Sequence, residues 1–355
     1  MNMKQQPWIG KPLTDILFIL LPPFGCLLFI ALFPSLFQNN KNMPDAAWVV
    51  LILLIDVAHV YSTLYRTYFD TEYFKKQKSI LLTVPFIGFI GGVVIYSMSS
   101  LLFWRLLAYT AVFHFVRQQY GFLRVYSRKE APGSVSRLID AITIYTVTLY
   151  PLLYWHLNGP RNFNWFLPND FLYVESALLS TMFFIIYILV CALFIIKETM
   201  AAVKTKWVNL PKILVVLGTA LSWYFGIVYF NGDMAFTLLN VVSHGIPYMA
   251  LVWIYGKKSQ SANGNRFLRI VFSRNGVILF VLVLAVFAFI EEGLWDLFVW
   301  KEHGSVFGTN ALPGIVIPNQ WLAFIVPLLT LPQLTHYILD GFIWRIRKGV
   351  FSWKS

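Results

Sequence analysis

The sequence predicts an all-α fold, a polytopic membrane bundle of about ten transmembrane helices in a single integral membrane domain, residues 1–355. Composition is the first reason: 58% of the residues are hydrophobic and 12% are charged, whereas a soluble domain carries about 25% charged residues. The mean hydropathy is +0.66. The second reason is the presence of ten apolar segments of the length that a bilayer requires, about 20 residues.

The ten segments follow one another without room for a soluble domain. We place them at 14–33, 47–66, 80–99, 101–124, 138–156, 172–196, 211–230, 235–255, 276–298 and 320–344. A tight turn near Ser99 separates the third from the fourth, and Asn231-Gly232-Asp233, residues typical of turns, separates the seventh from the eighth. No small-residue cleavage site follows the first segment, so we expect a retained helix and not a signal peptide. Cys26 and Cys191 lie inside apolar runs and are expected to pack as small hydrophobes.

The basic residues give the orientation. Twenty-three of the 28 lysines and arginines fall in one set of alternate loops and at the termini, whereas the other loops hold only Lys41, Arg161 and Lys301. Positive residues favour the cytoplasmic side of a membrane. We therefore predict that both termini are cytoplasmic, in a bacterial inner membrane. The net charge of +12 then serves orientation and contact with anionic membrane lipids, and no nucleic acid is expected as a partner.

Four histidines lie inside four different apolar segments: His59, His114, His244 and His336. Each precedes the first cytoplasmic basic residue of its segment by 7 to 13 positions. At about 1.5 Å per residue their depths differ by on the order of 9 Å. Ionisable residues inside a membrane usually mark function, and neutral imidazole is a common ligand of iron, zinc and copper. The sequence therefore predicts a metal site formed by these four side chains.

Two carboxylates accompany this set. Asp56 lies three residues before His59, and Asp340 lies four residues after His336, so each pair shares a helix face. A carboxylate in this position can accept the second ring N–H of the imidazole, or can bind the metal itself. We predict roles for Asp56 and Asp340 in the catalytic site on this basis.

Arg117 and Gln118 follow His114 by three and four residues. Both are predicted to face the same side of the helix and to orient the substrate or the oxygen intermediate. A buried arginine needs an anionic partner, which Asp56, Asp340 or a substrate head group would supply. Pro247 and Pro332 are expected to kink the eighth and tenth segments near their histidines.

Other polar residues of the apolar segments are assigned to the outer boundary of the membrane. His156 and His303 are expected to be ordinary interfacial residues. Glu291, Glu292 and Asp296 are expected to form an acidic end of the ninth segment, and a site for cation or proton entry is the alternative interpretation.

Four intramembrane histidines without thiolates suit a single non-haem iron. The positions of His59 and His114 in early segments, with a third histidine at His244, resemble the Brp/Blh family of bacterial membrane carotenoid-cleaving dioxygenases, in which histidines on different helices hold one ferrous ion. The chain departs from that family in two ways. It has no H-x-x-x-H pair, because Asp340 stands where the second histidine of such a pair would follow His336. It also has more segments. The membrane desaturase and hydroxylase family agrees less well, because its di-iron site needs more than the six histidines of this chain.

We therefore expect a membrane-embedded, metal-dependent oxygenase that uses Fe(II) and dioxygen on a lipid or isoprenoid substrate from the bilayer. Cleavage, hydroxylation and desaturation remain open. Three alternatives come from other classes: a b-type haem protein with histidine pairs as axial ligands, an intramembrane zinc hydrolase, and an ion- or proton-coupled transporter that uses Asp56, Arg117 and Asp340.

Overall fold

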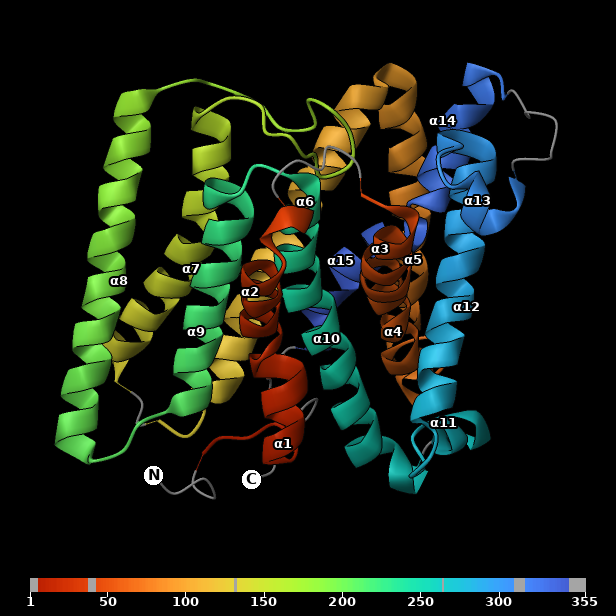
Figure 1. Ribbon diagram of the computed structural model, residues 1–355. Helices are drawn as coiled ribbons and strands as arrows, with labels where there is room; N and C mark the ends of the chain where they lie inside the picture. Colours follow the sequence, from red (N-terminus) through yellow and green to blue (C-terminus); the bar gives the residue numbers. More distant parts are fainter. Residues whose placement is uncertain (1–5, 38–42, 131–132, 264, 310–316, 345–355) are drawn as a thin grey trace. The chain divides into compact units, whose positions relative to one another are not determined.

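A computed structural model describes residues 6–37, 43–130, 133–263, 265–309 and 317–344, and every regular element within these ranges is helical (Figure 1). The all-α prediction is therefore confirmed for this part of the chain. Both termini, together with Lys4, Lys41 and the basic residues of 345–355, lie outside the described residues. The cytoplasmic position of the termini remains a prediction.

Eight helical stretches of the described residues are long and apolar enough to cross a membrane, which indicates an integral membrane protein. Four of them are single helices or most of one: α5 (Thr71–Met98), α7 (Ser134–Leu157), α8 (Ala177–Thr205) and α10 (Asp233–Asn263). Two stretches in the first and middle parts of the chain join several elements: Asp45–Arg66 (α3, Asp45–Trp48; η4, Val49–Val57; α4, Ala58–Arg66) and Leu210–Tyr229 (α9, Leu210–Trp223; η5, Tyr224–Tyr229). Two more do so near the end: Val277–Trp300 (α12, Val277–Trp295; η6, Asp296–Trp300) and Asn319–Ile343 (α14, Asn319–Leu329; α15, Leu331–Ile343).

The first predicted segment is bent. Pro12–Leu20 (α1, Pro12–Asp15; η2, Ile16–Leu20) and α2 (Pro22–Leu32) meet at an angle of 54°. Pro22 and Pro23 explain the bend, because proline lacks the N–H that would continue the helix and its ring clashes with the preceding turn. Counted as one span, this pair raises the total to nine.

The fourth predicted segment is the long helix α6 (Ser100–Tyr126), which has 27 residues. At about 1.5 Å per residue it extends roughly 40 Å, enough to cross a bilayer. It is not among the eight apolar stretches, since it carries Arg105, Arg117, Gln118 and Gln119. The total of ten spans therefore remains a prediction.

The chain forms two compact units. Of the described residues, unit 1 contains 6–37 and 115–247, and unit 2 contains 43–114 and 248–344. Two helices contribute to both: α6 passes from unit 2 to unit 1 after His114, and α10 passes from unit 1 to unit 2 after Pro247.

Unit 1 is built on α7, which packs along α8 and α9; these three helices lie together at the left of Figure 1. Its apolar core comprises Leu123, Ile144, Val147, Tyr150, Tyr187, Phe194 and Val216. A buried ion-pair network joins the three helices at one end. There Lys212 Nζ lies 2.7 Å from Glu130 Oε1 and 2.5 Å from Glu198 Oε1, and Lys197 pairs with Asp140 and Glu198.

In unit 2, α5 packs on α14 and α15, and α12 packs on η4 and α4. Glycine in α5 allows this helix to approach α14 closely. A Cβ atom built on Gly92 would lie 2.9 Å from Pro327 Cβ, whereas one built on Gly91 would meet nothing within 4 Å. The shorter elements of the described chain are η3 (Pro34–Leu36), α11 (Arg266–Val271) and α13 (Gly304–Phe307).

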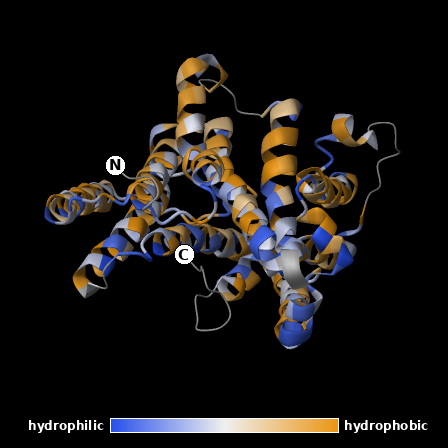
Figure 2. Ribbon diagram, turned by 90° about the horizontal axis from the view of Figure 1, so that it is seen from below, coloured by the Kyte–Doolittle hydropathy of each residue, from blue (hydrophilic) through white to orange (hydrophobic). Residues whose placement is uncertain are grey.

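The outward faces of the long helices are apolar, and hydrophobic residues predominate along their ribbons in Figure 2. In α5 and α8 only 11% of the most apolar stretch is buried inside the protein. Leu178, Leu189 and Ile195 of α8 are each more than 60% exposed. Contiguous apolar surface of this kind is costly in water and stable in lipid, so these faces suit contact with the hydrocarbon of a membrane.

Candidate metal centre

Three of the four predicted histidines lie together in unit 2: His59 on α4, His114 on α6 and His336 on α15. The ring centroids of His59 and His336 are 5.0 Å apart, and those of His114 and His336 are 4.5 Å apart. Each side chain is at most 2% exposed, and each offers a ligand nitrogen within 4.8 Å of the others. Two nitrogens bound to one ion at about 2.1 Å can be at most about 4.2 Å apart. Small rotations of the imidazoles would therefore let one ion contact all three.

Local backbone structure places His59 and His336. His59 is the second residue of α4, which continues the π-helical stretch η4. Turns of π-helix occur frequently at functional sites. The tenth predicted segment breaks at Thr330, and Pro332 occupies the first turn of α15, where its missing N–H needs no partner. In contrast, α10 continues through Pro247 without a break.

The polar contacts of His336 leave one ring nitrogen for a ligand. Thr63 Oγ1 lies 2.7 Å from His336 Nδ1 and 3.0 Å from the hydroxyl of Tyr248. His336 Nε2 is buried and has no hydrogen-bond partner. A buried polar atom without a partner is rare in a native protein and requires an explanation. A metal ion bound at Nε2 supplies one, because the hydrogen bond of Nδ1 to Thr63 then fixes the required tautomer.

Both predicted carboxylates lie beside a histidine of this cluster, but Asp340 lies beside His114 and not beside His336, with which the sequence paired it. Asp340 Oδ2 lies 3.4 Å from His114 Nδ1, and Asp56 Oδ1 lies 3.7 Å from His59 Nδ1. The second distance is longer than a hydrogen bond. Asp340 is therefore close enough to orient the ring of His114, and both carboxylates can balance the charge of a cation.

Aromatic side chains surround the three rings. Tyr248 meets His59, His114 and His336 edge-on, with centroids 6.0, 6.4 and 5.0 Å away. Tyr337 stacks on His114 at 5.2 Å. The sequence prediction missed Thr63 and Tyr248, although each follows one of the predicted histidines by four residues and so shares its helix face.

His244, the fourth predicted ligand, belongs to unit 1. Its ring stacks on that of Phe115, with the ring centroids 3.5 Å apart. Its backbone carbonyl accepts a hydrogen bond from Gln118 Nε2 at 2.9 Å. Gln118 thus holds the turn of α10 that carries His244. On the continuous helix α10, His244 precedes Tyr248 by four residues, which is about one helical turn.

Arg117 has different surroundings from those expected. Its side chain is exposed, it donates to the hydroxyl of Tyr145 at 2.6 Å, and it lies over the ring of Tyr120. Among the described residues it forms no ion pair with Asp56, Asp340 or any other carboxylate. The expectation of a buried arginine with an anionic partner is therefore wrong, because the side chain is exposed and contacts two tyrosines. A role of Arg117 toward substrate remains a prediction.

The remaining two histidines have ordinary partners. His156 Nδ1 lies 2.6 Å from the carbonyl oxygen of Leu152. The ring of His303 stacks on that of Trp48, with the centroids 3.8 Å apart, and His303 Nδ1 lies 3.2 Å from Asp45 Oδ1.

The acidic end of the ninth predicted segment is more buried than an interfacial position implies. Glu291, Glu292 and Asp296 are each 8% exposed or less. Asp296 accepts hydrogen bonds from the backbone N–H of His303 and from the Thr309 hydroxyl, both at 2.7 Å. Asp296 thus holds the segment that follows η6.

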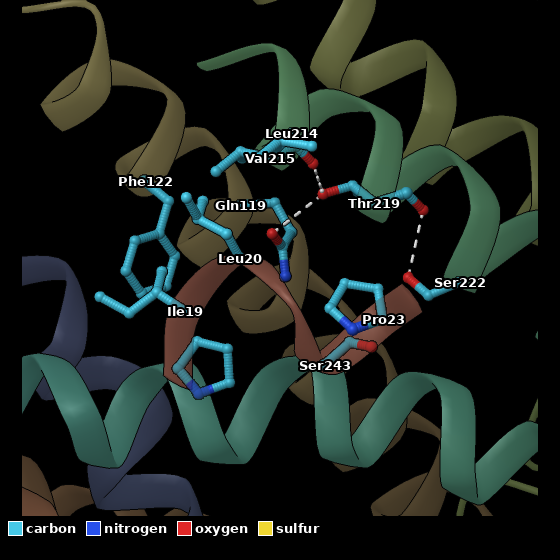
Figure 3. Close-up of a pocket in the computed structure, with 11 residues that line it drawn as sticks. Ile19, Leu20, Pro23, Gln119, Phe122, Leu214, Val215, Thr219, Ser222 and Ser243 are labelled. Atoms are coloured by element: carbon cyan, nitrogen blue, oxygen red, sulfur yellow. Dashed lines mark hydrogen bonds between the residues drawn. The ribbon is translucent and has the colours of Figure 1, made fainter. Parts of the chain in front are cut away.

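None of these histidines lines a small cavity in unit 1 (Figure 3). Gln119, Thr219, Ser222 and Ser243 contribute its polar lining, and Thr219 Oγ1 lies 3.0 Å from Gln119 Oε1. Its volume of about 10 Å³ is close to that of one water molecule. The cavity is therefore too small for an organic substrate.

Comparison with known proteins identifies no relative: no family model, no curated protein and no solved structure matches this chain. The interpretation of the histidine cluster therefore depends on its own geometry and chemistry.

Proposed function

We propose that this chain is a membrane-embedded oxygenase that binds one Fe(II) ion and uses dioxygen to oxidise a lipid-soluble substrate. The observation that carries the proposal is the cluster of three buried histidines in unit 2, with His336 Nε2 left unpartnered. Nitrogen donors without thiolates suit iron, zinc and copper, and a set of ligands that leaves positions open for dioxygen and substrate is typical of non-haem Fe(II) oxygenases.

His244 is proposed as the fourth ligand. Tyr248 packs against all three rings of the cluster, and His244 lies one turn before it on the same continuous helix. Residues four apart on a helix share a face. Gln118 is assigned a positioning role, since it holds the backbone of that turn.

When bound, the iron supplies the activation of dioxygen. The protein residues orient and shield it. Thr63 holds the Nδ1 side of His336, Asp340 balances charge beside His114, and Tyr248 and Tyr337 exclude water from the rings. Exclusion of water protects reactive oxygen chemistry from side reactions.

The substrate class follows from the position of the ligands within the apolar stretches. His59 belongs to Asp45–Arg66 and His336 to Asn319–Ile343. A substrate that reaches them is soluble in the bilayer, and we propose a lipid or an isoprenoid. The proposed topology has ten spans with both termini in the cytoplasm of a bacterial inner membrane.

The geometry disfavours the haem alternative. Axial imidazoles bind on opposite faces of a porphyrin, and ring centroids 4.5 to 5.0 Å apart leave no room for a macrocycle between them. A zinc hydrolase would use the same donor set, so the identity of the metal distinguishes it.

Nitric oxide is a suitable probe of the proposal, because it forms a complex with high-spin Fe(II) that is visible by electron paramagnetic resonance. Anaerobic protein loaded with Fe(II) should give this signal, and His336→Ala should lose it while His156→Ala retains it. A protein that binds zinc but gives no such signal would favour the hydrolase.

A further inference from the structure

A buried arginine lies in unit 2, where α4 ends and α5 begins. Arg66, the last residue of α4, is only 2% exposed. Its guanidinium carbon lies 4.2 Å from the ring centroid of Tyr255 and 4.6 Å from that of Tyr73. Its Nε is buried without a hydrogen-bond partner, and it forms no ion pair with any residue that the structure describes.

Arg66 borders a cavity of about 510 Å³ that Lys75 and Lys76 also line. Two carboxylates line it as well, and both have partners: Asp70 accepts from the backbone N–H at the start of α5, and Glu72 lies 3.7 Å from Lys75. Three positive and two negative side chains give the cavity a net positive charge. It is also large enough for a group of several heavy atoms.

A buried cation without a counter-charge is unfavourable. The faces of Tyr73 and Tyr255 compensate part of the loss of solvation through cation–π contacts, but Nε of the guanidinium has no acceptor. A planar guanidinium held between two rings presents its N–H edge in a fixed direction. This arrangement matches the paired oxygens of a phosphate group.

The position of the cavity along the chain indicates its level in the membrane. Arg66 is the last residue of one candidate span, and Thr71 is the first residue of the next. Residues at such junctions lie at the depth of lipid headgroups, where lysine and arginine contact phosphate. We propose that Arg66, together with Lys75 and Lys76, binds a phosphate group in this cavity, from an anionic lipid headgroup or from a free phosphate compound. This site is independent of the proposed metal centre.

Native mass spectrometry of the purified full-length protein tests the proposal. With phosphatidylglycerol added, the wild type should retain the lipid in preference to phosphatidylcholine. Arg66→Gln should weaken retention by roughly tenfold to a hundredfold, as expected for loss of hydrogen bonds to a charged group. Arg66→Lys should give an intermediate result, because it keeps the charge but loses the planar fork.

Two further variants make the test independent of folding. The double variant Lys75→Gln/Lys76→Gln changes only exposed side chains and should also weaken retention. Lys78→Gln, on the same helix but outside the cavity lining, should bind like the wild type.

Competition with inorganic phosphate distinguishes the two sources. Displacement of the lipid would indicate a site for free phosphate, and retention of the lipid would indicate a headgroup site. Equal lipid retention by the wild type and the double variant, with no effect of inorganic phosphate, would overturn the proposal.

Discussion

The hydroxyl of Thr63 is the residue-level feature that most directly shapes the candidate metal centre. It contacts His336 Nδ1 and Tyr248, so it selects the nitrogen of His336 that is left for a ligand. Outer hydrogen bonds of this kind hold the ring orientation and tautomer that a metal requires.

Thr63→Val removes the hydroxyl and preserves the shape of the side chain. We expect metal affinity to fall by about 10–100-fold, since that is the usual effect of losing an outer hydrogen bond. Titration of the purified protein with a metal in competition with a chelator measures the change. Thr110→Val is the matched control, because within the described part of the chain the Thr110 hydroxyl bonds only the Leu106 carbonyl of its own helix. Unchanged affinity in Thr63→Val would show that the hydroxyl does not position His336.

Among single residues, the sequence predicted the histidines of the cluster, because a polar residue inside an apolar segment is conspicuous. His59, His114 and His336 are polar residues in apolar segments, and the structure brings them together. The surroundings of Arg117 were not predicted. A step of three residues rotates about 300° around a helix, so Arg117 points about 60° away from the direction of His114, and its long side chain reaches Tyr145 instead.

At the scale of elements, helix packing in unit 2 depends on small residues. Gly92 of α5 faces Pro327 of α14, where an added Cβ would lie 2.9 Å from the Pro327 Cβ. Small residues at helix contacts allow the close approach on which association in membranes depends.

Gly92→Ala is therefore expected to destabilise the protein by about 1–3 kcal/mol, the usual cost of overpacking. Gly91→Ala is the matched control, since a Cβ there meets nothing within 4 Å and alanine favours a helix more than glycine does. Thermal unfolding in detergent measures both variants. A Gly92→Ala variant as stable as Gly91→Ala would contradict the packing of α5 on α14.

The helices themselves were predicted well by apolar length, and their ends were not. The third predicted segment begins at residue 80, but α5 begins at Thr71, because Asp70 caps it and its first turns carry lysines that lie outside the apolar run. The bend at Leu21 breaks a segment predicted as one helix. Pro22 and Pro23 were visible in the sequence, but apolar length alone does not register a backbone break.

At the scale of the whole molecule, the unequal distribution of lysine and arginine predicts which loops are cytoplasmic. Reporter fusions after Lys206 and Lys258 should therefore give a cytoplasmic signal, and fusions after Asn162 and Gly308 should give a signal from the opposite side. A cytoplasmic signal from Gly308 would remove a span from the proposed topology and change the predicted depth of His336.

Metal analysis of the purified full-length protein tests the central claim most directly. We expect about one iron ion per chain and a sharp loss of metal in each single alanine variant of His59, His114, His244 and His336, because removing one donor from a buried site weakens the whole set. His156→Ala and His303→Ala should keep the wild-type metal content, since both histidines have other partners. Wild-type metal content in all four ligand variants, or equal loss in His303→Ala and His336→Ala, would contradict the account.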